Sequence, residues 1–184
     1  MPASPKRRRI RTGRRDWLWA VAAAVAVLAA VAIAFVMLAG GSSSGAKAVV
    51  AGVDCESGER LNYHVHAHLD IFIEGQATEV PTNIGIRPDC LFWLHTHAPN
   101  GLLHVEAPEK CDFTLEQFFA VWGQPLSSTQ LMDRTTDATH QVQATVNGET
   151  WSGNPADIPL TDKTTIVLEY GPPFVPPPSF DWGQ

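Results

Sequence analysis

The histidines of this chain are concentrated in one stretch. Six of the seven lie between residues 61 and 106, in the segments HVHAH, HTH and HVE. Neutral imidazole suits Zn²⁺ and copper, and protein sites for these ions use three or four ligands. The candidate metal ligands are His64, His66, His68, His95, His97, His104 and Glu106.

The alternating spacing of these histidines predicts β-strands. In a strand, residues i, i+2 and i+4 share a face, so His64, His66 and His68 point one way and the apolar residues between them point to a core. His64 and His68 stand about 13 Å apart at ~3.3 Å per residue, so one ion cannot bind all three. We expect His66 and one of its two neighbours to share an ion with histidines of an adjacent strand.

A tight turn after the second cluster predicts which residues meet. Ala98-Pro99-Asn100-Gly101 is a strong turn signal. A hairpin turning on Pro99 and Asn100 places His95 opposite His104, with Glu106 on the same face. Directly opposed residues have Cβ atoms about 4.5 to 5.5 Å apart, close enough for two imidazoles to bind one ion. His104 and Glu106 are then a fourth ligand or groups that orient the ligands, and Asp70 is a further candidate for the orienting role.

Other roles are open for the same residues. The histidines can be polar residues of a solvated face, tied to backbone carbonyls. A metal site with an open position can instead be catalytic, with Glu106 or Asp70 as general base on bound water, or with copper in redox chemistry. A third alternative involves no metal: the Pro-rich tail, residues 171–184, can bind a protein partner of the cell envelope.

The N-terminal part predicts a membrane anchor. Residues 1–16 carry seven Lys and Arg, and residues 17–39 are 23 residues without charge or proline. About 20 apolar residues span a bilayer, and basic flanks stay cytoplasmic. We expect a cytoplasmic segment, a single transmembrane helix in the plasma membrane, a flexible linker at 40–52 and an extracytoplasmic domain at 53–170. A cleaved signal peptide, with Ala46-Lys47-Ala48 as its cleavage site, is the alternative.

The charge of the exported part limits its partners. Past residue 40 there are 6 Lys and Arg against 18 Asp and Glu, a net charge of −12 with neutral histidines. This acidity argues against nucleic acid as a partner and suits cations. In an oxidising compartment the three cysteines predict one disulfide, and Cys55 with Cys90 is the favoured pair of three possible pairs. A thiolate metal ligand is the alternative, without C-x-x-C spacing to support it.

The remaining patterns predict a mainly β fold, a small sandwich or barrel-like antiparallel sheet, with one short α-helix. Hairpins are expected at 61–73 with 77–81, at 90–97 with 102–106, and at 141–146 with 149–151, followed by a strand at 164–170. Thr114 and Gln117 form a capping-box pattern before a helix at 115–122, which Gly123 ends.

Four motifs in this sequence resemble those of a group of bacterial proteins with a single membrane anchor and an exported His-rich domain. They are H-x-H-x-H at 64–68, L-H-T-H at 94–97, H-V-E at 104–106 and F-T-L-x-Q-F-F-x-V-W-G-Q at 113–124. The likeness spans most of the exported domain and implies no particular activity. The sequence therefore predicts an anchored domain that binds copper or zinc for capture or delivery.

Overall fold

The computed structural model describes residues 48–183. The segments expected at 1–16 and 17–39, and most of the linker expected at 40–52, lie outside these residues. Within the described part of the chain, no helix has both the length and the apolar character needed to cross a membrane.

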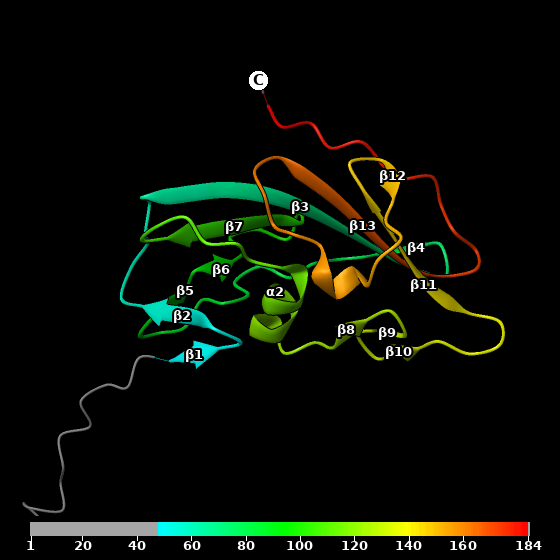
Figure 1. Cartoon of the computed structure of the whole chain (residues 1–184), viewed down its shortest axis with the longest axis horizontal. Helices are drawn as coiled ribbons and strands as arrows, with labels where there is room; N and C mark the ends of the chain where they lie inside the picture. The colour runs from blue at the N-terminus through cyan, green and yellow to red at the C-terminus, as the bar shows by residue number, and fades with distance from the viewer. Residues whose placement is uncertain (1–47, 184) are drawn as a thin grey trace, which may run out of the picture. The chain divides into compact units, whose positions relative to one another are not determined.

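A seven-stranded sheet forms the centre of the domain (Figure 1). Its strand order is β12-β11-β13-β3-β7-β6, and β4 pairs with β3 beside β7. Strand β3 is therefore flanked by β13 on one edge and by β7 and β4 on the other. The strands are β3 (Tyr63–Ile73), β4 (Gln76–Thr78), β6 (Leu94–His95), β7 (Leu102–Ala107), β11 (Gln141–Val146), β12 (Glu149–Thr150) and β13 (Thr164–Gly171).

Residues 48–183 are mainly β with one α-helix, as predicted. The prediction of an antiparallel sheet is wrong for its central pair of strands. Strand β13 pairs with β3 in parallel, from Thr164 opposite Ala67 to Tyr170 opposite Ile73. Parallel pairing needs a long crossover, which residues 74–163 supply. Strand β13 is buried along almost its whole length, as is usual for a parallel strand covered on both faces.

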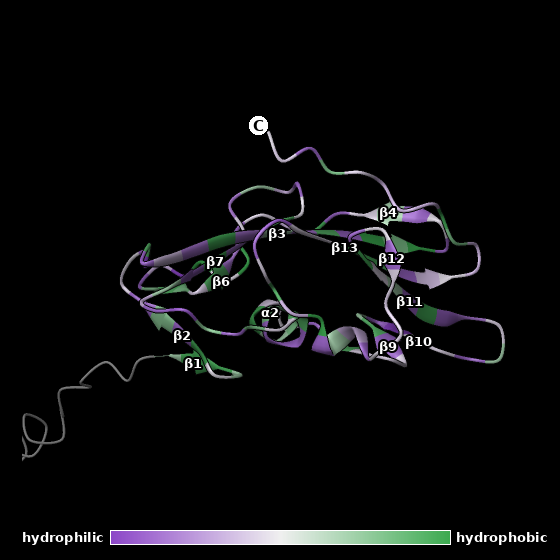
Figure 2. Cartoon of the chain, turned by 45° about the horizontal axis from the view of Figure 1, so that its top comes forward, coloured by the Kyte–Doolittle hydropathy of each residue, from purple (hydrophilic) through white to green (hydrophobic). Residues whose placement is uncertain are grey.

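Two small sheets and the helix lie on one side of the large sheet, as Figure 1 and Figure 2 both show. One sheet has the order β1-β2-β5 and the other β10-β9-β8. Strand β1 falls within the range expected to be linker, so the folded domain begins earlier than the expected residue 53. The elements are β1 (Val49–Val50), β2 (Val53–Glu56), β5 (Leu91–Phe92), β8 (Leu126–Ser127), β9 (Gln130–Leu131), β10 (Arg134–Thr135), α2 (Leu115–Trp122) and a 3-10 helix, η1 (Pro155–Asp157).

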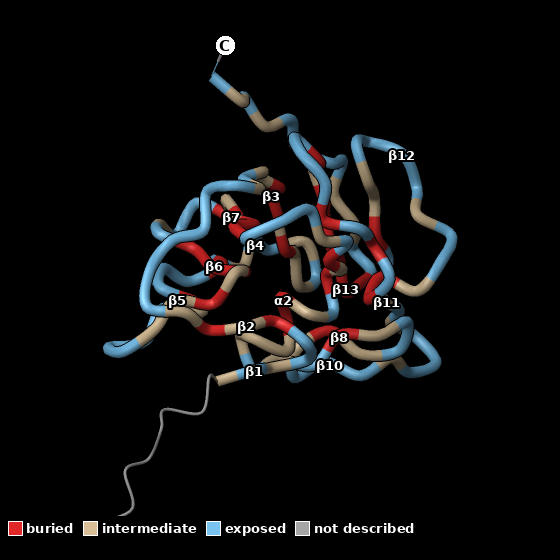
Figure 3. The backbone as a smooth tube through the Cα atoms, turned by 60° about the vertical axis from the view of Figure 1, so that its left-hand side comes forward, coloured by how far each residue is buried: buried red, intermediate tan, exposed pale blue. Residues whose placement is uncertain are grey.

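Helix α2 has the predicted bounds. The Gln117 side chain accepts a hydrogen bond from the Thr114 backbone N–H at 2.9 Å, and Gly123 ends the helix in the left-handed conformation. Leu115, Phe118 and Phe119 are buried. They join the core that the apolar face of β3 contributes through Ala67, Leu69 and Ile71. Figure 3 shows buried backbone along the large sheet and around α2, with exposed residues on the loops and the tail.

The predicted hairpins form with changed boundaries. The first turns on Glu74 and Gly75, so its second strand is Gln76–Thr78 instead of 77–81. The strand expected at 90–97 is divided at Trp93. The Trp93 N–H donates to the Asp54 carbonyl, while its own carbonyl accepts from the Glu106 N–H. Trp93 therefore joins β2 of the small sheet to β7 of the large one.

The tail lies against its own domain. The Val175 backbone N–H donates to the buried Glu169 carboxylate at 2.7 Å. Further along, the Phe180 ring stacks on His68, with ring centroids 3.7 Å apart. This contact places residue 180 beside β3, so the tail folds back over the sheet.

Candidate metal centre

Three neighbouring strands carry the candidate ligands. His66 on β3 lies opposite His104 on β7, and His104 also lies opposite His95 on β6. His64 lies opposite Glu106 in the same register. The predicted pairing of His95 with His104 is therefore confirmed, and it brings ligands that are distant in sequence onto one face.

The ring nitrogens in this cluster are separated by distances typical of ligands on one ion. His64 Nε2 is 3.1 Å from His66 Nε2, and His66 Nε2 is 3.2 Å from His104 Nδ1. His95 Nε2 is 3.1 Å from His97 Nε2. Tetrahedral ligands at 2.0 to 2.1 Å from zinc lie about 3.3 to 3.4 Å from one another. Small side-chain adjustments are therefore enough to hold a metal ion among these groups.

Glu106 lies at the centre of the cluster. Its Oε1 is 3.3 Å from His64 Nε2, 3.4 Å from His104 Nδ1 and 3.8 Å from His95 Nε2, so it faces one histidine from each of three strands. The side chain is 3% exposed, and its Oε2 has no hydrogen-bond partner. Burial, together with the nearby Glu59 charge, raises the pKa of Glu106 above its usual value. A bound cation would supply the positive charge that this buried carboxylate lacks.

A backbone contact fixes the tautomer of His95. Its Nδ1 lies 2.9 Å from the Phe92 carbonyl oxygen, which can only accept, so Nδ1 carries the proton and donates. Nε2 is then unprotonated and turned toward His97 and Glu106. Hydrogen bonds of this kind orient metal-binding histidines. Burial lowers the pKa of His95 to about 4, so the ring is neutral at physiological pH.

Two further histidines are also kept neutral. Burial is the main cause of the lowered pKa of His104, which falls to about 3, and the neighbouring His66 adds to the effect. The pKa of His66 is lowered by burial and by His64. Neutral imidazoles can bind a metal ion without first releasing a proton.

The structure separates two predicted residues from this cluster. His68 Nε2 is 2.9 Å from the Asn100 carbonyl, and its Nδ1 is 3.5 Å from Asp70 Oδ2. Its ring lies under Phe180. Asp70, whose pKa is raised chiefly by burial, therefore faces His68 and not the ligands around Glu106.

Two residues near the cluster escaped the sequence analysis. Glu59 Oε1 lies 3.9 Å from His97 Nε2 at the exposed side of the cluster. Asp162 Oδ1 accepts from the His66 backbone N–H at 3.3 Å and so supports β3 at this residue. Glu59 lies in a loop without a motif. Asp162 contacts β3 because β13, which begins close to it in the chain, pairs with β3 in parallel. Its role could not be predicted without knowledge of that pairing.

Two of the cysteines form a disulfide next to the strand that orients His95. A disulfide joins Cys55 to Cys90, the pair favoured from the sequence, and Cys111 has no disulfide. Cys55 lies opposite Phe92 in the pairing of β2 with β5. Phe92 is the residue whose carbonyl orients His95. The disulfide therefore restrains β2 and the residues next to β5, and β5 carries the carbonyl that orients His95.

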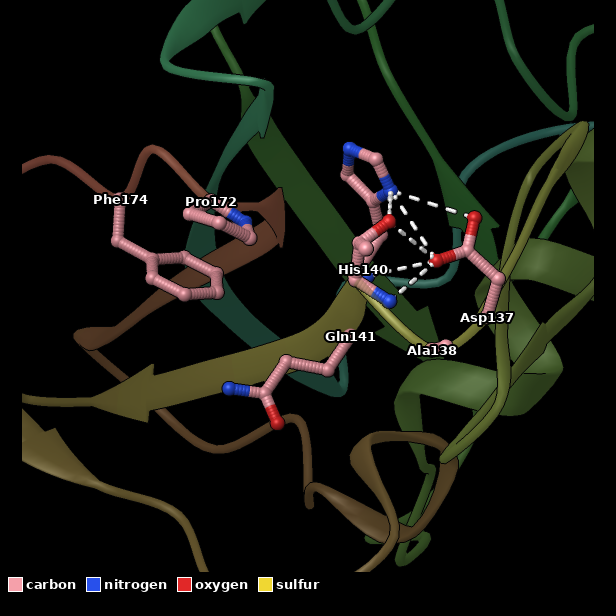
Figure 4. Close-up of a pocket in the computed structure, with 7 residues that line it drawn as sticks. Asp137, Ala138, His140, Gln141, Pro172 and Phe174 are labelled. Carbon is pink, nitrogen blue, oxygen red and sulfur yellow. Dashed lines mark hydrogen bonds and ion pairs between the residues drawn. The ribbon is translucent and has the colours of Figure 1, made fainter.

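The seventh histidine lies in a different place. His140 Nδ1 is 3.2 Å from Asp137 Oδ1, and its ring stacks on Tyr170. Figure 4 shows His140 and Asp137 beside a cavity of about 350 Å³, with Pro172 and Phe174 on its other side. Tyr170 pairs with Ile73 at the C-terminal end of β3, whereas His64 lies near its start. His140 is therefore remote from the cluster.

Comparison with known proteins adds no relative. No protein-family model, curated protein or solved structure matches this chain. The resemblance to anchored bacterial His-rich proteins stays a prediction. What the geometry defines is a partly buried His/Glu cluster that can hold a metal ion.

Proposed function

We propose that this chain is a membrane-anchored protein whose extracytoplasmic domain binds copper or zinc for capture or delivery. The observation that carries the proposal is the convergence of six ligand groups, five of them on one face of three strands and the sixth, His97, in the loop after β6. These groups are His64, His66, His95, His97, His104 and Glu106.

The donor set supports a transition metal over calcium or magnesium. The cluster offers five imidazoles and one carboxylate. Calcium and magnesium prefer sites made of oxygen atoms, whereas imidazole suits zinc and copper. Burial that keeps His66, His95 and His104 neutral further favours ion binding at neutral pH.

A histidine whose ring is tied to the backbone has a different arrangement. His68 illustrates it, because its Nε2 is directed at a backbone carbonyl. In the cluster, the nitrogens of His64 and His66 instead face each other at 3.1 Å, as do those of His95 and His97. Paired nitrogens directed at one another, beside a buried carboxylate, are what a shared cation would bring together.

The test is elemental analysis of the full-length chain, purified from its native compartment without a polyhistidine tag. We expect bound copper or zinc in the wild type and its loss when His66, His95 and His97 are together replaced by Gln. His140→Gln is the matched control and should keep the metal, because His140 lies outside the cluster. A wild type with no metal, and with no uptake on dialysis against Zn²⁺ or Cu²⁺, would overturn the proposal.

The proposed anchoring rests on residues 1–39 and has its own test. The uncharged stretch at 17–39 and the seven basic residues before it support a position of the His-rich domain outside the cytoplasm. After cell fractionation we expect the chain in the membrane pellet, with its C-terminal domain open to protease added to spheroplasts. Recovery of an uncleaved chain in the cytoplasmic fraction would contradict this part of the proposal.

A further inference from the structure

The number of ligands in the cluster is larger than one tetrahedral ion uses. Six side chains converge, whereas a zinc site takes four ligands or three with an open position. One ion would leave two or three of these groups without a role. The surplus is therefore the first indication that the cluster holds more than one ion.

The ligand atoms divide into two overlapping sets. His95, His97, His104 and Glu106 form one set, and His64, His66 and His104 form the other; within each set the ligand atoms lie within 4.8 Å of one another. Among the described residues, the hydrogen-bond distances link His64 to His66 and His95 to His97, and none links the first pair to the second. Each pair therefore supplies two neighbouring ligands that can chelate one ion within its own set.

His104 is suited to serve both sets. Its ring lies between the two pairs: it packs edge-on against His66 and against His97, with centroids 4.6 Å apart in each case, and stacks on His95 at 5.2 Å. Imidazole has two ring nitrogens, and either can bind a metal. Glu106 Oε1 also faces both sides, at 3.3 Å from His64 and 3.8 Å from His95.

We infer that the cluster is a dinuclear centre for two transition-metal ions. One ion is held by His64 and His66 and the other by His95 and His97, with Glu106 between them. His104 is the ligand that both ions share: it binds one ion through each ring nitrogen, as an imidazolate whose N–H proton has passed to solvent. This inference rests on the proposed metal-binding function and adds its stoichiometry and the division of its ligands.

The carboxylates of the site can serve two ions. Glu106 is buried, and its Oε2 atom has no hydrogen-bond partner. A carboxylate with one oxygen engaged and the other free can bridge two cations. The Glu59 carboxylate, 3.9 Å from His97, adds negative charge on the side of the second pair.

The experiment measures stoichiometry in the full-length chain without a polyhistidine tag. After metal removal and dialysis against Zn²⁺, elemental analysis should give two equivalents in the wild type and in the His140→Gln control. The double variant His64→Gln with His66→Gln should retain one equivalent, and so should His95→Gln with His97→Gln. One equivalent in the wild type would overturn the dinuclear inference and leave the proposed function intact, whereas none would overturn both.

Copper gives a second measurement that needs no variant. Two Cu²⁺ ions bridged by the His104 ring should couple magnetically. The doubly integrated electron paramagnetic resonance signal should then account for less than half of the copper found by elemental analysis. A signal that accounts for all of the copper at two equivalents would show isolated ions and overturn the shared role of His104.

Discussion

At the scale of single residues, the chemistry of the cluster depends on the Glu106 carboxylate, which is buried beside histidine rings. Glu106 is 3% exposed, and its raised pKa reflects the cost of burying its charge. A buried carboxylate destabilises the metal-free fold and attracts a cation. Removal of its charge should therefore not lower the stability of the metal-free protein but should weaken metal binding.

Replacing Glu106 with Gln tests this opposition. The change keeps the shape of the side chain but removes its charge, so the metal-free protein should unfold at an equal or higher temperature. Zinc affinity should fall at least about 10-fold, the lower end of the range for groups that support metal ligands. Thermal unfolding and a competitive zinc titration give the two values.

Glu59→Gln is the matched control for that variant. Glu59 is about half exposed and lies 3.9 Å from His97, so solvent screens its charge. Its loss should lower zinc affinity by no more than about 3-fold, since an exposed pair contributes well under 1 kcal/mol. Equal effects of the two substitutions would mean that Glu106 has no special position in the site.

The lowered pKa values of His95 and His104 predict how the metal-free protein responds to acid. Both groups bind a proton at about pH 6.5 when unfolded, but only near pH 4 and 3 when folded. The unfolded state therefore takes up more protons below pH 6.5, and stability should fall as the pH drops from 6.5 towards 4. The slope is at most about 1.4 kcal/mol per pH unit for each group.

Urea unfolding of the metal-free chain at pH 7 and pH 4.5 measures this loss. His104→Asn removes one of the two groups, so the variant should lose less stability than the wild type over the same interval. The raised pKa of Glu106 acts in the opposite direction, which makes the comparison between variant and wild type the informative one. An identical loss in both proteins would contradict the assignment to His104.

At the scale of elements, the loop before β5 sets the position of His95. Gly85 has a φ of +75°, and a Cβ atom there would lie 2.4 Å from the Leu94 carbonyl oxygen and 3.1 Å from the His95 Cβ. The backbone of this loop thus packs directly on the strand that carries a ligand. The close approach is possible only because residue 85 has no side chain.

Gly85→Ala should therefore affect both stability and metal binding. The positive φ alone costs an alanine about 1 to 2 kcal/mol, and contact with Leu94 adds to that cost. Gly148→Ala is the matched control, because Gly148 also has a positive φ, +82°, but no atom lies within 4 Å of the added Cβ. We expect a larger loss of unfolding free energy in Gly85→Ala, and lower zinc affinity in that variant alone; equal losses would contradict the contact.

Local patterns explain why much of this arrangement could be predicted from the sequence. The period-2 spacing of His64 and His66 and the turn at Pro99 and Asn100 gave the face and the register of the ligands, and the structure confirms the pairing of His95 with His104. The capping box before Leu115 gave the helix bounds. Each of these features depends on interactions between residues close together in sequence.

Features that depend on distant pairing could not be predicted in this way. The parallel pairing of β13 with β3 joins residues almost one hundred positions apart, as at Ala67 and Thr164, and no local turn specifies it. The division of the strand at Trp93 likewise depends on Asp54 of another sheet. His68 follows the same alternation as His66, yet its ring bonds to the Asn100 carbonyl, so spacing alone could not exclude it.

At the scale of the whole molecule, the cluster connects three strands at one edge of the large sheet. The ligands come from β3, β7, β6 and the loop after β6, and β6 is only two residues long. A metal ion bound by all three strands would hold the edge of the large sheet together. In the unfolded chain these ligands are far apart, so the ion favours the folded state and its binding free energy adds to stability.

Removal of the metal should therefore lower the melting temperature of the domain. The expected change in unfolding free energy follows the free ion concentration, at about 4 kcal/mol when that concentration is 1,000 times the dissociation constant. Calorimetry of the metal-loaded chain before and after dialysis against a chelator measures the change. The triple variant with Gln at positions 66, 95 and 97 should show no response to the chelator, and His140→Gln should respond as the wild type does. Protection should also be local: amide hydrogen exchange in β6 and β7 should quicken on metal removal more than in β11, which lies next to the strand at the other edge of the sheet. A uniform change across the sheet would mean that the ion stabilises the protein from a different site.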